Sequence, residues 1–123
     1  MKTGRWLTWI GSILLFLTGI GHGSKLGNVQ GMIAASSVKF PLAGMMRACW
    51  LAFSGEMVAL AVIAALASAM AQGSRFVLIC GLTMVFNAWV LLHFLGLFIG
   101  VYVSVAVAVL FLAGGFLQTK QAA

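Results

Sequence analysis

The sequence predicts an all-α integral membrane protein built as a bundle of four transmembrane helices. Of its 123 residues, 63% are hydrophobic and only 7% are charged. Soluble domains carry about 25% charged residues, so a water-soluble fold could not hide this much apolar surface. A helix that crosses ~30 Å of hydrocarbon needs about 20 residues, and four such helices leave room only for short connections. We therefore expect one membrane domain that covers residues 1–123, with the lipid bilayer as its solvent.

Four apolar segments are long enough to span, and we predict helices at about 6–26, 41–71, 76–95 and 99–117. Trp6 and Trp9 stand at the start of the first segment, where an interfacial aromatic belt is expected. Lys2 and Arg5 precede this segment in the manner of a signal peptide. No small-residue cleavage site follows promptly, so we expect a retained span.

The polar stretch at residues 24–39 allows two interpretations. Leu26, Val29 and Ile33 have helical spacing, which favours an interfacial amphipathic helix. An irregular loop fits the same composition. The next helix is expected to start at Pro41, because proline is tolerated in the first turn.

Positive charges mark the ends of the apolar segments. With four spans, both termini and the turn after the second span share one side. That side holds four of the seven cationic residues (Lys2, Arg5, Arg75 and Lys120), against three on the other (Lys25, Lys39 and Arg47). The positive-inside rule therefore predicts both termini in the cytoplasm. The charges form no continuous stripe, so nucleic acid is not an expected partner.

Glu56 is the only acidic residue in the chain, and it lies inside the second apolar segment. A charged side chain at such a position costs around 2.5–3.5 kcal/mol on insertion scales. Intramembrane carboxyl groups therefore usually face a partner, a cavity or a pathway. Glu56 either serves a function or is a hydrogen-bonding group between helices, and the sequence leaves both open.

Other polar residues are expected at a similar depth, because successive helices alternate in direction. His22, Asn87 and His93 fall toward the same membrane face as Glu56. We predict one outward-facing cavity that binds a ligand, lined by His22, Arg47, Trp50, Glu56, Asn87 and His93. For each histidine taken alone, an ordinary interfacial position is favoured over a ligand-binding role.

Three function classes follow from this pattern. The first is binding of a lipophilic small molecule such as a quinone, an isoprenoid or a lipid. The second is a non-catalytic accessory subunit of a larger membrane complex. The third is a redox protein, with a haem held by His22 and His93 or a metal held with Glu56, although no spacing motif supports either. No nucleophile–base pair, phosphate loop or CxxC motif indicates a catalytic mechanism, so whether the chain is an enzyme stays open.

Glycines recur every four residues at the end of the first segment and beyond it. They line one face of a helix and let another backbone approach closely. The contact can form within the bundle or between copies, so we expect a homo-oligomer or a partner complex. The four glycines are Gly19, Gly23, Gly27 and Gly31.

Two stretches, LLFLTGIGHGSKLG and MMRACWLAFSGEM, carry a family resemblance. The chain resembles small uncharacterised bacterial four-helix membrane proteins of the DoxX-like type. The resemblance implies a four-helix fold in a bacterial inner membrane. It implies no activity and no site residue.

Overall fold

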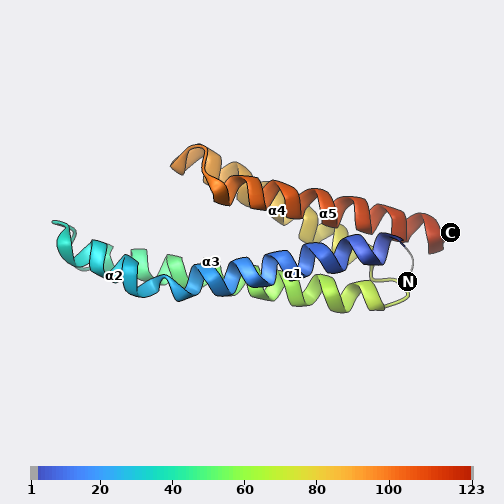
Figure 1. The fold of residues 1–123 in the computed structure, drawn as a ribbon, viewed down its shortest axis with the longest axis horizontal. Coiled ribbons are helices and arrows are strands. Elements are labelled where there is room, and N and C mark those ends of the chain that lie inside the picture. The colour runs from blue at the N-terminus through green and yellow to red at the C-terminus, as the bar shows by residue number, and fades with distance from the viewer. Residues whose placement is uncertain (1–2, 123) are drawn as a thin grey trace.

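The computed structural model describes residues 3–122 and is helical almost throughout (Figure 1). Four helical segments of the described chain are long and apolar enough to cross a membrane. This confirms the predicted all-α, four-span bundle. In chain order the helices are α1 (Thr3–Ser24), α2 (Leu26–Ala35), α3 (Leu42–Ala69), α4 (Ser74–Leu95) and α5 (Ile99–Ala122).

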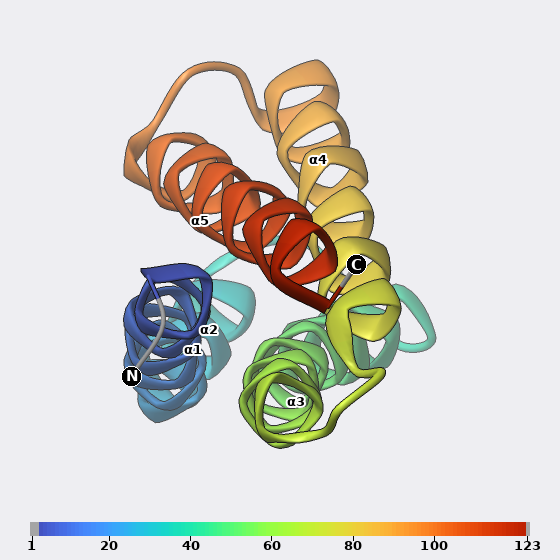
Figure 2. The same ribbon diagram turned by 90° about the vertical axis from the view of Figure 1, so that its right-hand side faces the viewer.

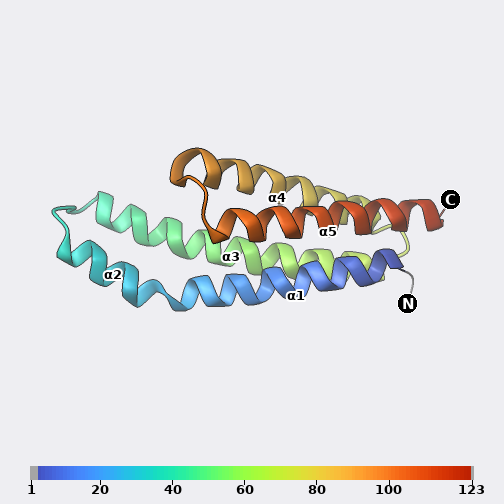
Figure 3. The same ribbon diagram turned by 45° about the horizontal axis from the view of Figure 1, so that its top comes forward.

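Residues 24–39 form a helix rather than an irregular loop over most of their length. α2 prolongs α1 after a short break at Lys25, and both run alongside α3 (Figure 3). Val29 and Ile33, two of the three residues whose spacing predicted this helix, are buried against Ala43 of α3. The segment therefore extends the α1–α3 pair.

The bundle consists of two antiparallel pairs, α1 with α3 and α4 with α5. α5 also packs against α1, whereas the α3–α4 seam is the least extensive of the four neighbouring contacts. Figure 2 shows that α1 and α4 lie diagonally across the bundle and that α4 diverges from α3 along its length. The two pairs are closest at the end that holds the 70–73 turn.

The core is filled mainly by small and medium side chains. Large apolar residues such as Leu17, Leu82 and Val109 remain exposed on the outside, as expected for a surface that faces lipid. The helices approach closely because the facing positions are small, which is how helices associate in membranes. The buried cluster includes Leu15, Met57, Ala61, Ala64, Val77, Met84, Val107, Ala108 and Phe111.

α1 and α5 approach each other closely through paired glycines. A Cβ on Gly114 would lie 2.5 Å from Thr8 Oγ1, and one on Gly4 would lie 2.8 Å from the Gly114 carbonyl oxygen. Gln118 Nε2 donates hydrogen bonds to Thr8 Oγ1 (2.9 Å) and to the Gly4 carbonyl (3.2 Å). Backbone contact and a polar side-chain network therefore hold this crossing together.

The cationic residues lie at opposite ends of the bundle. Arg5, Arg75 and Lys120 stand at the end where α1 begins and α5 ends. Arg5 Nη2 donates to the Ala69 carbonyl at 3.5 Å. Lys2 lies outside the described residues. The remaining cations (Lys25, Lys39 and Arg47) lie toward the opposite end, where α1 ends and α3 begins, as the sequence predicts.

Gly114→Ala should destabilise the bundle by roughly 1–3 kcal/mol, because the added methyl group meets Thr8 Oγ1 in a packed crossing. Gly21→Ala is the matched control, since a Cβ there meets nothing within 4 Å. Thermal unfolding in detergent, followed by circular dichroism, measures both variants. Equal melting temperatures for the two would contradict close packing at the α1–α5 crossing.

Candidate ligand-binding site

Glu56 is half-buried on α3 and faces α4. Asn87 Nδ2 donates a hydrogen bond to Glu56 Oε1 at 3.1 Å. Both residues stand about 20 Å from the 70–73 turn at 1.5 Å per helical residue, well inside the hydrocarbon thickness. Within residues 3–122, Glu56 Oε2 and Asn87 Oδ1 have no hydrogen-bond partner. The pair therefore retains unused hydrogen-bonding capacity.

Asn87 points into the bundle because of its position on α4. The buried residues of that helix recur at helical spacing, and Asn87, 8% exposed, continues the same face. The members of this face are Val77, Cys80, Gly81, Met84, Asn87 and Ala88. The α4 sequence therefore aims an amide at α3 at the height of Glu56.

His22 belongs to a different cluster, at the α1–α3 contact. Its Nδ1 lies 2.8 Å from Ser54 Oγ, and its ring stacks on Trp50 with centroids 3.7 Å apart and planes 17° apart. Trp50 Nε1 in turn donates to the His22 carbonyl oxygen at 2.9 Å. The cluster ties the end of α1 to α3.

Ser54 Oγ connects His22 with the Trp50 carbonyl oxygen. The Ser54 hydroxyl donates to that carbonyl at 3.0 Å, so its oxygen accepts from the His22 Nδ1–H at 2.8 Å.

His93 and Arg47 lie outside both clusters. His93 is exposed on α4 and stacks on Trp89, with centroids 5.5 Å apart. Arg47 is exposed and makes no hydrogen bond or ion pair with any residue from 3 to 122. Both are available to lipid head groups or solvent rather than to Glu56.

The six predicted residues therefore do not converge on one another. The structure joins Glu56 with Asn87 and His22 with Trp50, on different sides of α3. Residues two positions apart on a helix, such as Ser54 and Glu56, point about 200° apart. Depth along the helix placed the residues at similar heights, but it did not give the direction of each side chain. Ligand binding by these residues stays a prediction.

Sequence reasoning missed Ser54. It lies one helical turn after Trp50, on the face that meets α1, and it fixes the His22 ring. Its spacing from Trp50 was the available signal, because residues i and i+4 share a helix face.

The described residues contain no group of three or more His, Cys, Asp or Glu side chains placed to hold a metal ion. A haem with both histidines as axial ligands requires two rings that converge on one iron. His22 stacks on Trp50 and His93 on Trp89, from helices that lie diagonally across the bundle. This arrangement gives the haem hypothesis no support.

Comparisons of the chain with known protein families, with curated proteins and with solved structures found no match. The DoxX-like resemblance therefore stays a prediction. The functional argument rests on the geometry of the polar residues alone.

Trp50→Phe should destabilise the protein by about 1 kcal/mol, because it removes the indole N–H that donates to the His22 carbonyl. Trp89→Phe is the control, since Trp89 is 56% exposed and has no hydrogen bond within the described chain. Thermal unfolding in detergent measures both. An equal loss of stability in the two variants would show that aromatic bulk, not this hydrogen bond, matters.

Proposed function

We propose that this polytopic membrane protein binds a lipophilic small molecule at the Glu56–Asn87 pair. The supporting observation is the lone carboxyl group, held by one hydrogen bond and with one oxygen unpartnered among the described residues. No cation in that part of the chain forms an ion pair with it. A ligand with a polar group would complete its hydrogen bonding.

The energetics favour a ligand over an empty site. A polar group that faces hydrocarbon without a partner costs free energy, roughly 1–3 kcal/mol by protein mutational data, and half-buried Glu56 keeps its Oε2 in such a position. Water is scarce at this depth, so it is a poor substitute for a partner. A hydroxyl or carbonyl group of a bound molecule would meet Glu56 Oε2 or the Asn87 amide and remove much of this cost.

The depth of the pair selects the class of ligand. A molecule that reaches it from the bilayer needs an apolar body with one polar group, which fits a quinone, an isoprenoid or a lipid. α4 diverges from α3 with distance from the 70–73 turn (Figures 1 and 2), and their seam is the least extensive contact between neighbouring helices. Separation of the two helices is therefore the favoured route of entry.

Orientation completes the proposal. Both termini in the cytoplasm agree with the excess of cations at that end, four against three. The DoxX-like resemblance adds the inner membrane of a bacterium to the proposal. The wider end of the α3–α4 seam would then face the periplasm, and Glu56 would be approached from the outer leaflet.

An accessory or self-associating role is the second candidate. A Cβ on Gly27 or Gly31 of α2 would meet nothing within 4 Å, whereas Gly19 is packed against α3. These two glycines leave a backbone surface that another chain could approach.

Glu56→Gln should leave the protein folded but remove most of the co-purifying ligand, because the amide retains the hydrogen bond with Asn87 but loses the carboxyl group. Glu56→Leu should lose the ligand and also lower the free energy of unfolding by about 1–3 kcal/mol, because buried Asn87 then has no partner. The melting temperature should fall accordingly. Native mass spectrometry measures ligand content and oligomeric state together.

Thr83→Val is the control for the Glu56 variants. Thr83 lies one helical turn before Asn87 on α4. The substitution removes a hydroxyl that donates only to the Ile79 carbonyl of the same helix. Full ligand retention in a folded Glu56→Leu protein would exclude the carboxyl as the binding group. A stoichiometric protein partner with no small molecule would favour the accessory role instead.

Reporter fusions at Lys120 and at Asn28 should report opposite sides of the membrane, with the C-terminal fusion in the cytoplasm. The expectation follows from the even number of spans and from the distribution of cations. A periplasmic signal at Lys120 would reverse the orientation and place the open end of the seam in the cytoplasmic leaflet.

A further inference from the structure

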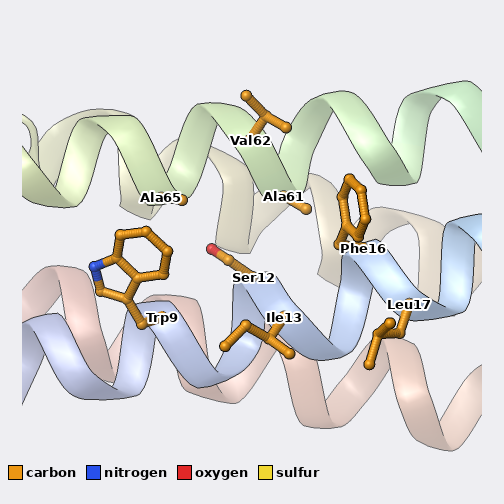
Figure 4. Close-up of a pocket in the computed structure, with 8 residues that line it drawn as sticks. All are labelled: Trp9, Ser12, Ile13, Phe16, Leu17, Ala61, Val62 and Ala65. Carbon is orange, nitrogen blue, oxygen red and sulfur yellow. The ribbon is translucent and has the colours of Figure 1, made fainter.

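A pocket of about 220 Å³ lies in the groove between α1 and α3 (Figure 4). Its rim consists of apolar side chains that are themselves exposed on the outer face of the bundle, so the pocket opens toward lipid. Ser12 contributes the only hydroxyl group. The lining residues are Trp9, Ser12, Ile13, Phe16, Leu17, Ala61, Val62 and Ala65.

The pocket exists because small residues face large ones. Ala61 and Ala65, one turn apart on α3, leave a hollow opposite Trp9 and Phe16 of α1 (Figure 4). The two aromatic rings stand on either side of Ser12 along α1, and the Ser12 hydroxyl points toward α3 between them. The result is an apolar hollow with one hydroxyl group at its base.

Ser12 is 4% exposed, and its Oγ is the one buried side-chain oxygen or nitrogen in residues 3–122 without a hydrogen-bond partner. Other hydroxyl groups on the same helix donate to backbone carbonyls of that helix. Thr8 and Thr18 on the same helix donate to the carbonyl four residues earlier, at 3.0 and 2.7 Å. Ser12 instead keeps an unpaired donor beside the pocket, and a buried donor without an acceptor destabilises the fold.

We propose that this pocket is a second binding site, for an uncharged, membrane-soluble ring that carries a carbonyl oxygen. The ring would fill the hollow over Ala61 and Ala65, and its oxygen would accept the Ser12 hydroxyl proton.

Size and chemistry both lead to this class. An apolar cavity of about 150 Å³ binds benzene, so about 220 Å³ holds a somewhat larger ring. The pocket contains no charged group, which excludes an ionic ligand at this depth. A carbonyl oxygen needs only one donor, and Ser12 supplies one.

The site is independent of the Glu56–Asn87 pair. Ala65 and Glu56 are nine residues apart on α3, which places them on opposite sides of the helix. The pocket belongs to the α1–α3 groove, whereas Glu56 bonds α4. A substitution that abolishes binding at one site should therefore leave binding at the other unchanged.

The test uses 1-indanone and indane, two rings of nearly the same shape of which only the first has a carbonyl. The full-length protein in detergent is labelled with 5-fluorotryptophan, and the four signals are assigned by single Trp→Phe variants. Titration should shift the Trp9 signal saturably and leave the Trp89 signal unchanged. Equal, unsaturable shifts of all four signals would show partitioning into the micelle and would overturn the site.

The hydroxyl is tested by the ratio of the two affinities. In the wild type, 1-indanone should bind about five-fold more tightly than indane after correction for partitioning, as one net hydrogen bond allows. Ser12→Ala should reduce this ratio to about one without loss of indane binding. An unchanged ratio in Ser12→Ala, or equal affinities in the wild type, would exclude a ligand chosen by its carbonyl and leave an acyl chain as the occupant.

Filling the pocket gives the remaining comparison. Ala65→Leu should abolish saturable binding of both rings, because the larger side chain occupies the hollow. Ala59→Leu is the matched control, since Ala59 is an exposed α3 residue outside the pocket. Persistent binding in Ala65→Leu would overturn the location. Glu56→Gln should leave binding of both rings intact, which separates this site from the first.

Discussion

The hydrogen bond between Asn87 and Glu56 is the constraint on which the arrangement of the bundle depends. It is the only side-chain hydrogen bond between α3 and α4 in residues 3–122. The hydrocarbon core supplies no water to replace it, so either residue alone would be left with an unpaired polar group. The 70–73 turn joins the two helix pairs at one end, and this bond fixes their relative height about 20 Å away.

The other contacts of the bundle rely on different physics. α5 meets α1 through glycines and the Gln118–Thr8 hydrogen bond, whereas α1 meets α3 through the His22–Trp50 stack and through Ser54. Hydrophobic burial distinguishes none of these surfaces, because lipid tails are as apolar as the side chains. Close approach and polar pairing therefore decide which helix faces meet. The α3–α4 seam has the least extensive close contact of the neighbouring helix pairs and only one polar side-chain pair, Asn87 with Glu56.

This distinction explains what the sequence predicted. Four apolar runs between charged ends depend only on length and composition, so the four spans could be read directly. The heights of Glu56 and Asn87 followed from counting residues. The direction of His22 did not, because helices that are apolar on all sides carry no amphipathic signal to orient them. The pocket beside Ser12 was also beyond reach, since it arises from Ala61 and Ala65 facing aromatic rings of another helix.

The two proposed sites differ in the hydrogen bonds they offer, and α3 separates them. Glu56 and Asn87 together present acceptor and amide groups, so they suit a ligand that donates or exchanges a proton. Ser12 presents a hydroxyl in an otherwise apolar hollow, which suits a ligand that only accepts. Both groups retain unpaired polar atoms inside the membrane, where such atoms carry a free-energy cost. Helix packing accounts for the bond between Asn87 and Glu56, but it uses neither Glu56 Oε2 nor the Ser12 hydroxyl. A ligand at each proposed site would give these two atoms the partners that packing leaves out.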